Sequence, residues 1–224
     1  MSPTLSALLD PGALAIVVAG TVIATVARSG WRDFGAALGA AGGLVRRGFQ
    51  PEANRRALAQ AVTAIQRDGQ RRADPALPPD PALAGMLESY LRHGTLEAMI
   101  QTRRSERELA EARRANAAQV FGCSGELAPV FGLIGTLYGF TQLTPNADAA
   151  STVTIMAAIS TAVLTSLYGA LIAHLVCYPA ASAIERRGNA EEREREALAE
   201  WFMAQIDRAG PGTQGHRTHL RGVA

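Results

Sequence analysis

The chain has 224 residues, of which 22 are basic and 20 acidic, so its formal net charge is +2. This excess is too small to indicate a nucleic-acid-binding protein, and we expect no nucleic-acid partner. Hydrophobic residues make up 48% of the chain and gather in three long stretches. This distribution outweighs the length, which would otherwise allow one or two soluble domains, and it predicts an all-α integral membrane protein with three transmembrane helices.

The first apolar stretch predicts a transmembrane helix over residues 8–28. Its uninterrupted part, residues 12–27, is 16 residues long, which is marginal for crossing a bilayer alone. A cleaved signal peptide is the alternative. A secretory signal begins with positive charge, however, and the residues before this stretch contain no Arg and end in Asp10.

Residues 29–126 are expected to form a helical cytoplasmic insert. Apolar residues recur at helical spacing over residues 52–68, and a second helix is predicted over residues 81–93, with Pro at its start and Gly94 after its end. A long helix follows from Thr95 to about residue 121. Its charged middle, RRSERELAEARR, is typical of a solvated helix; a docking surface for a cytoplasmic partner is the alternative.

Two further spans are predicted over residues 127–143 and 153–183, joined by a periplasmic loop of residues 144–152. The third span has 31 residues and lacks Asp, Glu and Arg, and neither span has an acidic or basic side chain apart from His174. Small residues take positions where a lipid-facing helix would carry Leu or Ile. We expect four glycines to pack these helices together, namely Gly132, Gly135, Gly139 and Gly169.

Hydroxyl side chains accompany the glycines in both spans. They include Thr136, which shares a face with Gly132 and Gly139, and Thr161, Thr165 and Ser166 in the third span. Hydroxyls bonded back to the carbonyl four residues earlier explain the pattern; a hydrated path for a small cation is the other interpretation. A proton or sodium path normally needs a carboxylate in the membrane. These spans have none, so a partner would have to supply it.

Three other residues of the spans have alternative interpretations. Pro129 stands where the second span is predicted to begin, which is ordinary for Pro. Pro179 is expected to kink the third span near its cytoplasmic end, either as a static bend or as a hinge. His174 is either a neutral, hydrogen-bonded residue or part of a proton relay.

The basic residues give the topology. All 22 are Arg, and none lies in residues 1–11 or 144–152. Because positive residues stay on the cytoplasmic side, we expect a multi-pass protein of the bacterial inner membrane with a periplasmic N-terminus and a cytoplasmic C-terminus. Residues 184–209 are predicted to form a cytoplasmic helix, and residues 210–224 a disordered tail.

No arrangement of residues typical of catalysis is present. The four His are dispersed, and Cys123 and Cys177 have no metal-ligand spacing. We therefore expect no enzyme activity, no metal and no cofactor. The two cysteines are interpreted as small buried residues of a reducing compartment.

Three segments carry a family resemblance. LAPVFGLIGTLYGF (127–140) and AAISTAVLTSLYGALIAHLVCYPAASAI (157–184) resemble the last two spans of the MotA/TolQ/ExbB proton channel family. DPGALAIVVAGTVIATV (10–26) is similar to the second span of the MotA branch, the flagellar stator proteins.

The resemblance implies a homopentamer around a MotB-, ExbD- or TolR-like partner, whose single span brings the membrane Asp. It implies that Thr136, Thr165 and Ser166 line a path for protons or sodium ions. It also implies that Pro129 and Pro179 couple ion passage to movement, and that a cytoplasmic rotor protein and membrane lipid are further partners.

Two departures from the family pattern bear on the branch. The chain lacks the first of the four MotA spans, which gives it the three-span layout of TolQ and ExbB. Thr161, however, stands where those proteins carry an intramembrane Glu, which favours the MotA branch. The leading hypothesis is a stator-type ion-conducting subunit. The alternatives are a TolQ/ExbB-like energiser that transmits proton motive force to an envelope-spanning system, and a non-conducting membrane scaffold.

Overall fold

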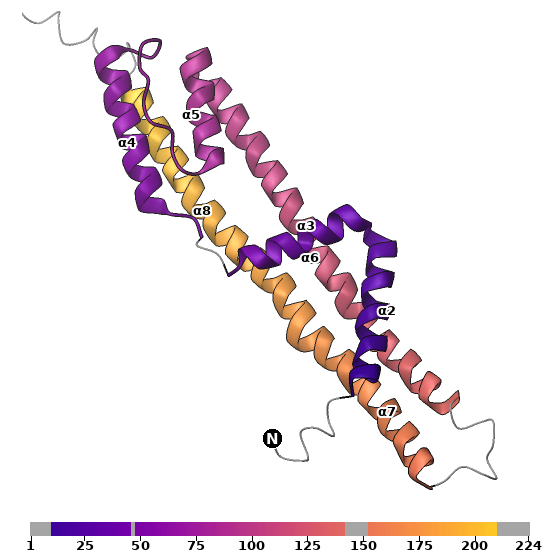
Figure 1. Ribbon diagram of the computed structural model, residues 1–224. Coiled ribbons are helices and arrows are strands. Elements are labelled where there is room, and N and C mark those ends of the chain that lie inside the picture. Colours follow the sequence, from indigo (N-terminus) through magenta and orange to yellow (C-terminus); the bar gives the residue numbers. More distant parts are fainter. Residues whose placement is uncertain (1–9, 46–47, 142–151, 210–224) are drawn as a thin grey trace, which may run out of the picture. The chain divides into compact units, whose positions relative to one another are not determined.

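The structure is a computed structural model, and it describes residues 10–45, 48–141 and 152–209. Within these ranges every regular element is helical, which confirms the predicted all-α fold. In chain order (Figure 1) the elements are α2 (Pro11–Ser29), α3 (Trp31–Gly43), α4 (Pro51–Asp68), α5 (Pro81–His93), α6 (Leu96–Thr141), α7 (Thr152–Leu171), the π-helix η1 (Ile172–Cys177) and α8 (Tyr178–Ala209).

Local sequence signals explain where several helices begin and end. The carboxylates of Asp10 and Asp80 cap α2 and α5 by accepting hydrogen bonds from the first backbone N–H groups, and each helix then opens on Pro. Gly94 ends α5 in the left-handed conformation, with φ of 75°. The helix predicted over residues 81–93 therefore has the bounds that the structure shows.

The helices that carry the second and third predicted spans extend beyond them. The insert helix expected to stop near residue 121 and the span expected from residue 127 form one helix, α6, and Pro129 lies inside it rather than at its start. The helix continues because its buried face continues, through Val120 and Cys123 to Ala128. In the same way α7, η1 and α8 follow one another without a loop.

Three helical segments are long and apolar enough to cross a membrane: Pro11–Ser29, Leu96–Thr141 and Ile155–Arg208. They overlap the three predicted spans, whose residues 8–10, 142–143 and 153–154 lie outside these segments. The predicted loop of residues 144–152 lies outside the described residues except for residue 152, where α7 begins, and the predicted tail of residues 210–224 lies wholly outside them.

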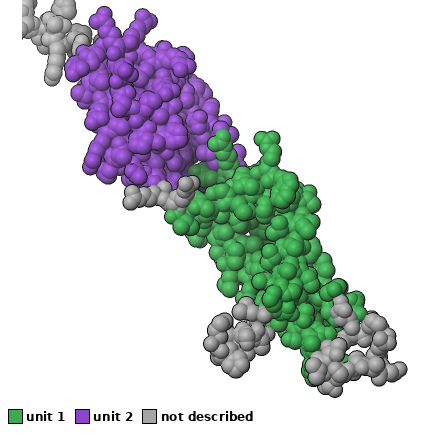
Figure 2. Space-filling view, in the orientation of Figure 1, with its two compact units in different colours: residues 1–46, 113–186 green, residues 47–112, 187–224 purple. Residues whose placement is uncertain are grey.

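The chain forms two compact units (Figure 2), and each has its own core. Unit 1 consists of residues 1–46 and 113–186. Within it, Ala13 and Val17 of α2 pack on Leu164 and Tyr168 of α7, and a second cluster joins α3 to α6 and α8. Unit 1 therefore holds the parts of the three helices on which the predicted site residues lie.

Unit 2 consists of residues 47–112 and 187–224, and its core lies between α4, α5, the first part of α6 and the last part of α8. Phe202 and Met99 are fully buried there. Arg103 is also buried, at 3% exposure, and pairs with Glu192 and Glu196. The predicted solvated face of the charged run is therefore interrupted at Arg103, because α8 covers that position.

A second ion pair of unit 2 ties α8 to the start of α5. Arg195 donates to the carboxylate of Asp80 at 2.8 Å. Burial lowers the pKa of Arg195, but the hydrogen bond and charge of Asp80, together with Glu191 and Glu192, outweigh it and leave that pKa raised. The guanidinium thus stays charged while Asp80 caps α5 with its other oxygen.

Candidate functional site

The contact between α6 and α7 depends on the absence of side chains at glycines of α6. A methyl group added to Gly132 would lie 2.9 Å from the carbonyl oxygen of Thr165, and one added to Gly135 would lie 2.7 Å from the Thr165 side chain. At Gly139 the nearest atom would be Cβ of Ala162, at 3.2 Å. All three glycines are buried. We call this contact the glycine seam, and it brings the two backbones close together.

Gly169 of α7 likewise allows close contact with α6. A methyl group there would lie 2.6 Å from the carbonyl oxygen of Ala128 and 3.1 Å from Cα of Pro129. These neighbours are backbone atoms, which cannot rotate away. Gly169 thus places α7 against the part of α6 that contains Pro129.

The three hydroxyl residues predicted for the ion path have different surroundings. Thr165 is fully buried in the glycine seam, and its hydroxyl donates to the carbonyl of Ala162 at 2.8 Å. Thr136 is partly buried and donates to the carbonyl of Leu133 at 2.6 Å. Both bonds reach three residues back rather than the expected four. Ser166 is exposed, and its Cα lies opposite Gly132.

A polar contact at the start of α2 was not expected from the sequence. The hydroxyl of Thr161 on α7 donates to the carboxylate of Asp10 at 3.1 Å, and the backbone N–H of Asp10 donates to the hydroxyl of Tyr168 at 3.0 Å. Asp10 lies at the start of α2, within the first predicted span. In the structure it is partly buried and joins α2 to α7. An Asp directly before Pro is a sequence signal for the helix cap.

Hydroxyls also join α2 to α6. Thr25 of α2 and Ser124 of α6 are buried, and their side-chain oxygens lie 3.1 Å apart. Ser124 donates in addition to the carbonyl of Val120. Thr21, one turn before Thr25, is buried as well, and its hydroxyl has no hydrogen-bond partner among the described residues. The buried face of α2 is therefore apolar in its first half and carries two threonines in its second half.

Pro179 lies just after a change in helix type. The N–H of Tyr178 donates to the carbonyl of Ala173, five residues back, which is the bond of a π-helix. Pro179 has no N–H, so the usual four-residue pattern cannot resume directly after Tyr178. The π-helix η1 thus lies just before the position at which a kink was expected, and His174 lies inside it.

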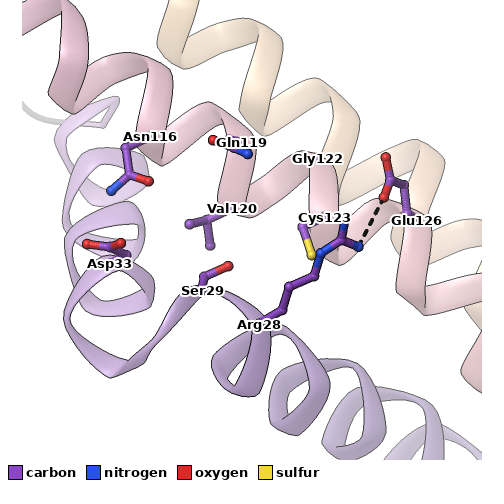
Figure 3. A pocket seen from close by; sticks show the side chains of 9 residues that line it. All are labelled: Arg28, Ser29, Asp33, Asn116, Gln119, Val120, Gly122, Cys123 and Glu126. Carbon is purple, nitrogen blue, oxygen red and sulfur yellow. Dashed lines mark ion pairs between the residues drawn. The ribbon is translucent and has the colours of Figure 1, made fainter.

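An open polar pocket of about 420 Å³ lies where α2 meets α3 and α6 (Figure 3). Arg28 forms an ion pair with Glu126 across it, at 3.5 Å, and Asp33 and Cys123 also line it. Both partners of the ion pair are 64% exposed, so the pair contributes little to stability.

The described residues contain no group of three His, Cys, Asp or Glu side chains that could hold a metal ion. Cys123 and Cys177 are both free thiols and both buried. Apart from the polar pocket, the polar side chains described above in unit 1 are hydroxyls, the carboxylate of Asp10 at the start of α2, and His174.

Fold and site together define a helical membrane protein whose spans meet through small and hydroxyl residues. The profile of the MotA/TolQ/ExbB proton channel family matches residues 78–197, more than half of the chain. The chain belongs to this family, and the family is one of channels. The resemblance seen in the sequence is confirmed.

Two relatives are similar over part of the chain. The chemotaxis protein PomA of Vibrio alginolyticus is 32% identical over 103 residues, which are 46% of this chain and 40% of PomA. The uncharacterised protein YtxD of Bacillus subtilis is 34% identical over 99 residues, or 44% of this chain and 36% of YtxD. The chain thus matches less than half the length of either relative.

Two solved structures have the same fold. The Campylobacter jejuni MotAB structure matches with a TM-score of 0.74 at 16% identity, covering 91% of this chain and 80% of the matched chain. The flagellar MotAB stator complex of Bacillus subtilis matches with a TM-score of 0.74 at 22% identity, covering 96% and 86%. The likeness shows that this chain has the fold of the matched chains.

Proposed function

We propose that this chain is the wall-forming subunit of a stator-type motor in the bacterial inner membrane, which couples the flow of protons or sodium ions to mechanical motion. The observation that carries the proposal is a combination within unit 1. Two spans pack through a glycine seam and present hydroxyl groups, yet residues 127–183 contain no Asp or Glu outside the 144–152 segment. An ion path of this kind needs a carboxylate from elsewhere.

A partner with one membrane span and one intramembrane Asp would complete the path. The matched structures are MotAB complexes, and their titles name two components. By analogy, we expect this chain to form a homopentamer around copies of a MotB-like partner. Its cytoplasmic unit would then act on a rotor protein.

The geometry favours different tasks for the three hydroxyl residues. Ser166 is exposed and Thr136 partly so, which suits side chains that face the partner and the ion. Thr165 is enclosed behind them, where its methyl and hydroxyl groups fill the space beside Gly135. We propose that Thr136 and Ser166 line the path and that Thr165 sets the distance between α6 and α7, which form its wall.

The test is ion flux through the complex of this chain with its single-span partner, reconstituted in liposomes. Thr136→Val and Ser166→Val keep the approximate shape but remove the hydroxyl, so we expect each to reduce flux. Ile134→Thr, at an exposed position two residues before Thr136 and therefore on another face of α6, is the matched control and should leave flux unchanged. Wild-type flux in both hydroxyl variants would contradict the assignment and support a non-conducting scaffold.

The second candidate function is a TolQ/ExbB-like energiser, since the family includes that branch. The gene beside this one separates the two. A single-span protein with a peptidoglycan-binding domain supports the stator, and a TonB-type neighbour supports the energiser. The similarity to PomA and to MotAB structures supports the stator.

We propose the orientation from the distribution of charge. Fifteen of the 22 Arg lie in residues 28–126 and seven in residues 184–224, so these segments are cytoplasmic and the N-terminus is periplasmic. Reporter fusions at residue 145 and at the C-terminus test this. We expect periplasmic activity only at the first position.

A further inference from the structure

His174 lies on the same side of its helix as Ser166. Ser166, Ala170 and His174 follow one another at four-residue intervals, which places them along one face of a helix. All three are exposed, whereas Thr165, Gly169 and Ala173 are buried against the neighbouring helices. A polar, exposed row therefore continues from the hydroxyl of Ser166 to the imidazole of His174, with only a small residue between them.

An ionisable side chain on this row has an unfavourable position if the row faces lipid. A charged group in the hydrocarbon region costs several kcal/mol on average, so such residues face a protein interior or a water-filled cavity. Ser166 leads to the same conclusion, because lipid contact would favour Leu or Ile at its position. The row is best explained as a surface that faces the partner helix and water.

The ring of His174 is held by Tyr178. The two ring centres are 5.4 Å apart, and the planes are inclined by 52°. Tyr178 in turn lies across α6 at Gly125, where an added methyl group would be 2.8 Å from the tyrosine ring. Because Gly125 has no side chain, the Tyr178 ring can pack closely against α6 there. The same ring contacts one side of the His174 imidazole.

His174 also lies within the π-helix η1. Single π turns inside longer helices are uncommon and occur frequently at functional sites. Here the turn directly precedes Pro179, so His174 lies in the segment whose helix type changes.

We propose that His174 relays protons at the cytoplasmic end of the path, and that the ion carried by this complex is therefore a proton. This inference rests on the proposed function and names the ion that it carries. In the relay, one ring nitrogen of the neutral imidazole accepts a proton from a hydronium ion beside Ser166. The other nitrogen releases its proton to water on the cytoplasmic side, and rotation of the ring restores the first tautomer.

The titratable groups next to His174 on its own helix are Cys177 and Tyr178. Tyr178 contacts α6 at Gly125, the residue before Glu126, and Glu126 pairs with Arg28 of α2. Glu126 and Arg28 balance each other's charge. No fixed net charge from these groups thus opposes a transient imidazolium.

The test is proton flux through the complex of this chain and its single-span partner in liposomes that hold a pH-sensitive dye. We expect His174→Ala and His174→Gln each to reduce proton flux by about a hundredfold. Millimolar imidazole should restore part of the flux in His174→Ala. Leu175→Ala, at the neighbouring exposed position, is the matched control and should keep wild-type flux.

Three outcomes overturn the inference. Wild-type flux in His174→Gln would show that hydrogen bonding suffices and that no proton is relayed, while the proposed function stands. Flux that requires sodium and ignores both His174 substitutions would leave the stator function with a different ion. Absence of any ion flux in the wild-type complex would overturn the proposed function, and the relay with it. Co-purification of the partner with each variant shows that the complexes have assembled.

Discussion

The hydroxyl of Thr161 donates a hydrogen bond of 3.1 Å to the carboxylate of Asp10, and so joins residues 151 positions apart in the chain. The other oxygen of Asp10 accepts from the N–H groups of Gly12 and Ala13 at the start of α2. One carboxylate therefore both begins the first span and attaches it to the third.

This double contact predicts a graded response at Asp10. Asp10→Ala removes the cap and the bond to Thr161, and we expect it to lower the free energy of unfolding by about 2 kcal/mol. Asp10→Asn keeps a capping oxygen and should cost about half as much. Thermal unfolding of the protein in detergent measures both changes. Equal losses for Ala and Asn would show that the negative charge, and not the cap, stabilises this contact.

The glycine seam predicts which glycines tolerate a larger side chain. In Gly169→Val the new side chain would meet backbone atoms of Ala128 and Pro129, so we expect a loss of about 3 kcal/mol or failure to assemble. Gly122→Ala is the matched control, since nothing lies within 4 Å of its added methyl group. It should be neutral or stabilising by about 0.5 kcal/mol. Size-exclusion chromatography and thermal unfolding provide the readout, and equal behaviour of the two variants would contradict the seam.

The buried ion pair of unit 2 predicts a large effect of Arg103. Arg103→Met removes the guanidinium that pairs with the buried carboxylate of Glu192, and we expect a loss of about 3–5 kcal/mol. The double variant Arg103→Met with Glu192→Leu should recover part of that loss, because the buried carboxylate of Glu192 is removed together with its partner, while Glu196 still lacks Arg103. Chemical unfolding of the purified protein measures both. The exposed Arg104 provides the control, and Arg104→Met should change stability by less than about 0.5 kcal/mol.

The π-helix before Pro179 predicts that this turn adapts when the proline is removed. Pro179→Ala supplies the missing N–H, so we expect residues 172–177 to move toward ordinary α-helix and their amide hydrogens to exchange more slowly. If this turn couples ion passage to movement, flux in the reconstituted complex falls while assembly is kept. Hydrogen exchange by mass spectrometry follows the first effect. Unchanged exchange would show that the π turn is imposed by packing and not by Pro179.

The sequence predicted the type of fold and most of the helix starts well. A long apolar segment without charge identifies a membrane span, because the free energy of transferring a residue into the bilayer depends mainly on that residue's own side chain. Local signals also worked at α5, where Asp80, Pro81 and Gly94 mark the ends by their own backbone chemistry. The small residues of the spans also predicted a close helix contact, because small side chains let two helix backbones approach each other.

Helix ends were harder to predict where packing decides them. Pro129 looked like the first residue of a span, yet α6 runs through it, since the buried face of that helix continues on both sides. The charged run before it looked fully solvated, and only its contact with α8 buries Arg103. A helix taken alone gives no sign of which of its faces another helix will cover.

What the sequence determined by itself is the chemical content of the membrane segments: hydroxyls, small residues, one histidine and no carboxylate in the last two spans. The tertiary structure decided how these groups are used. It enclosed Thr165 in the glycine seam, left Ser166 and His174 exposed, and brought Asp10 to Thr161. The physical reason is that composition is a property of single residues, whereas exposure and hydrogen bonding depend on which faces of distant helices come together.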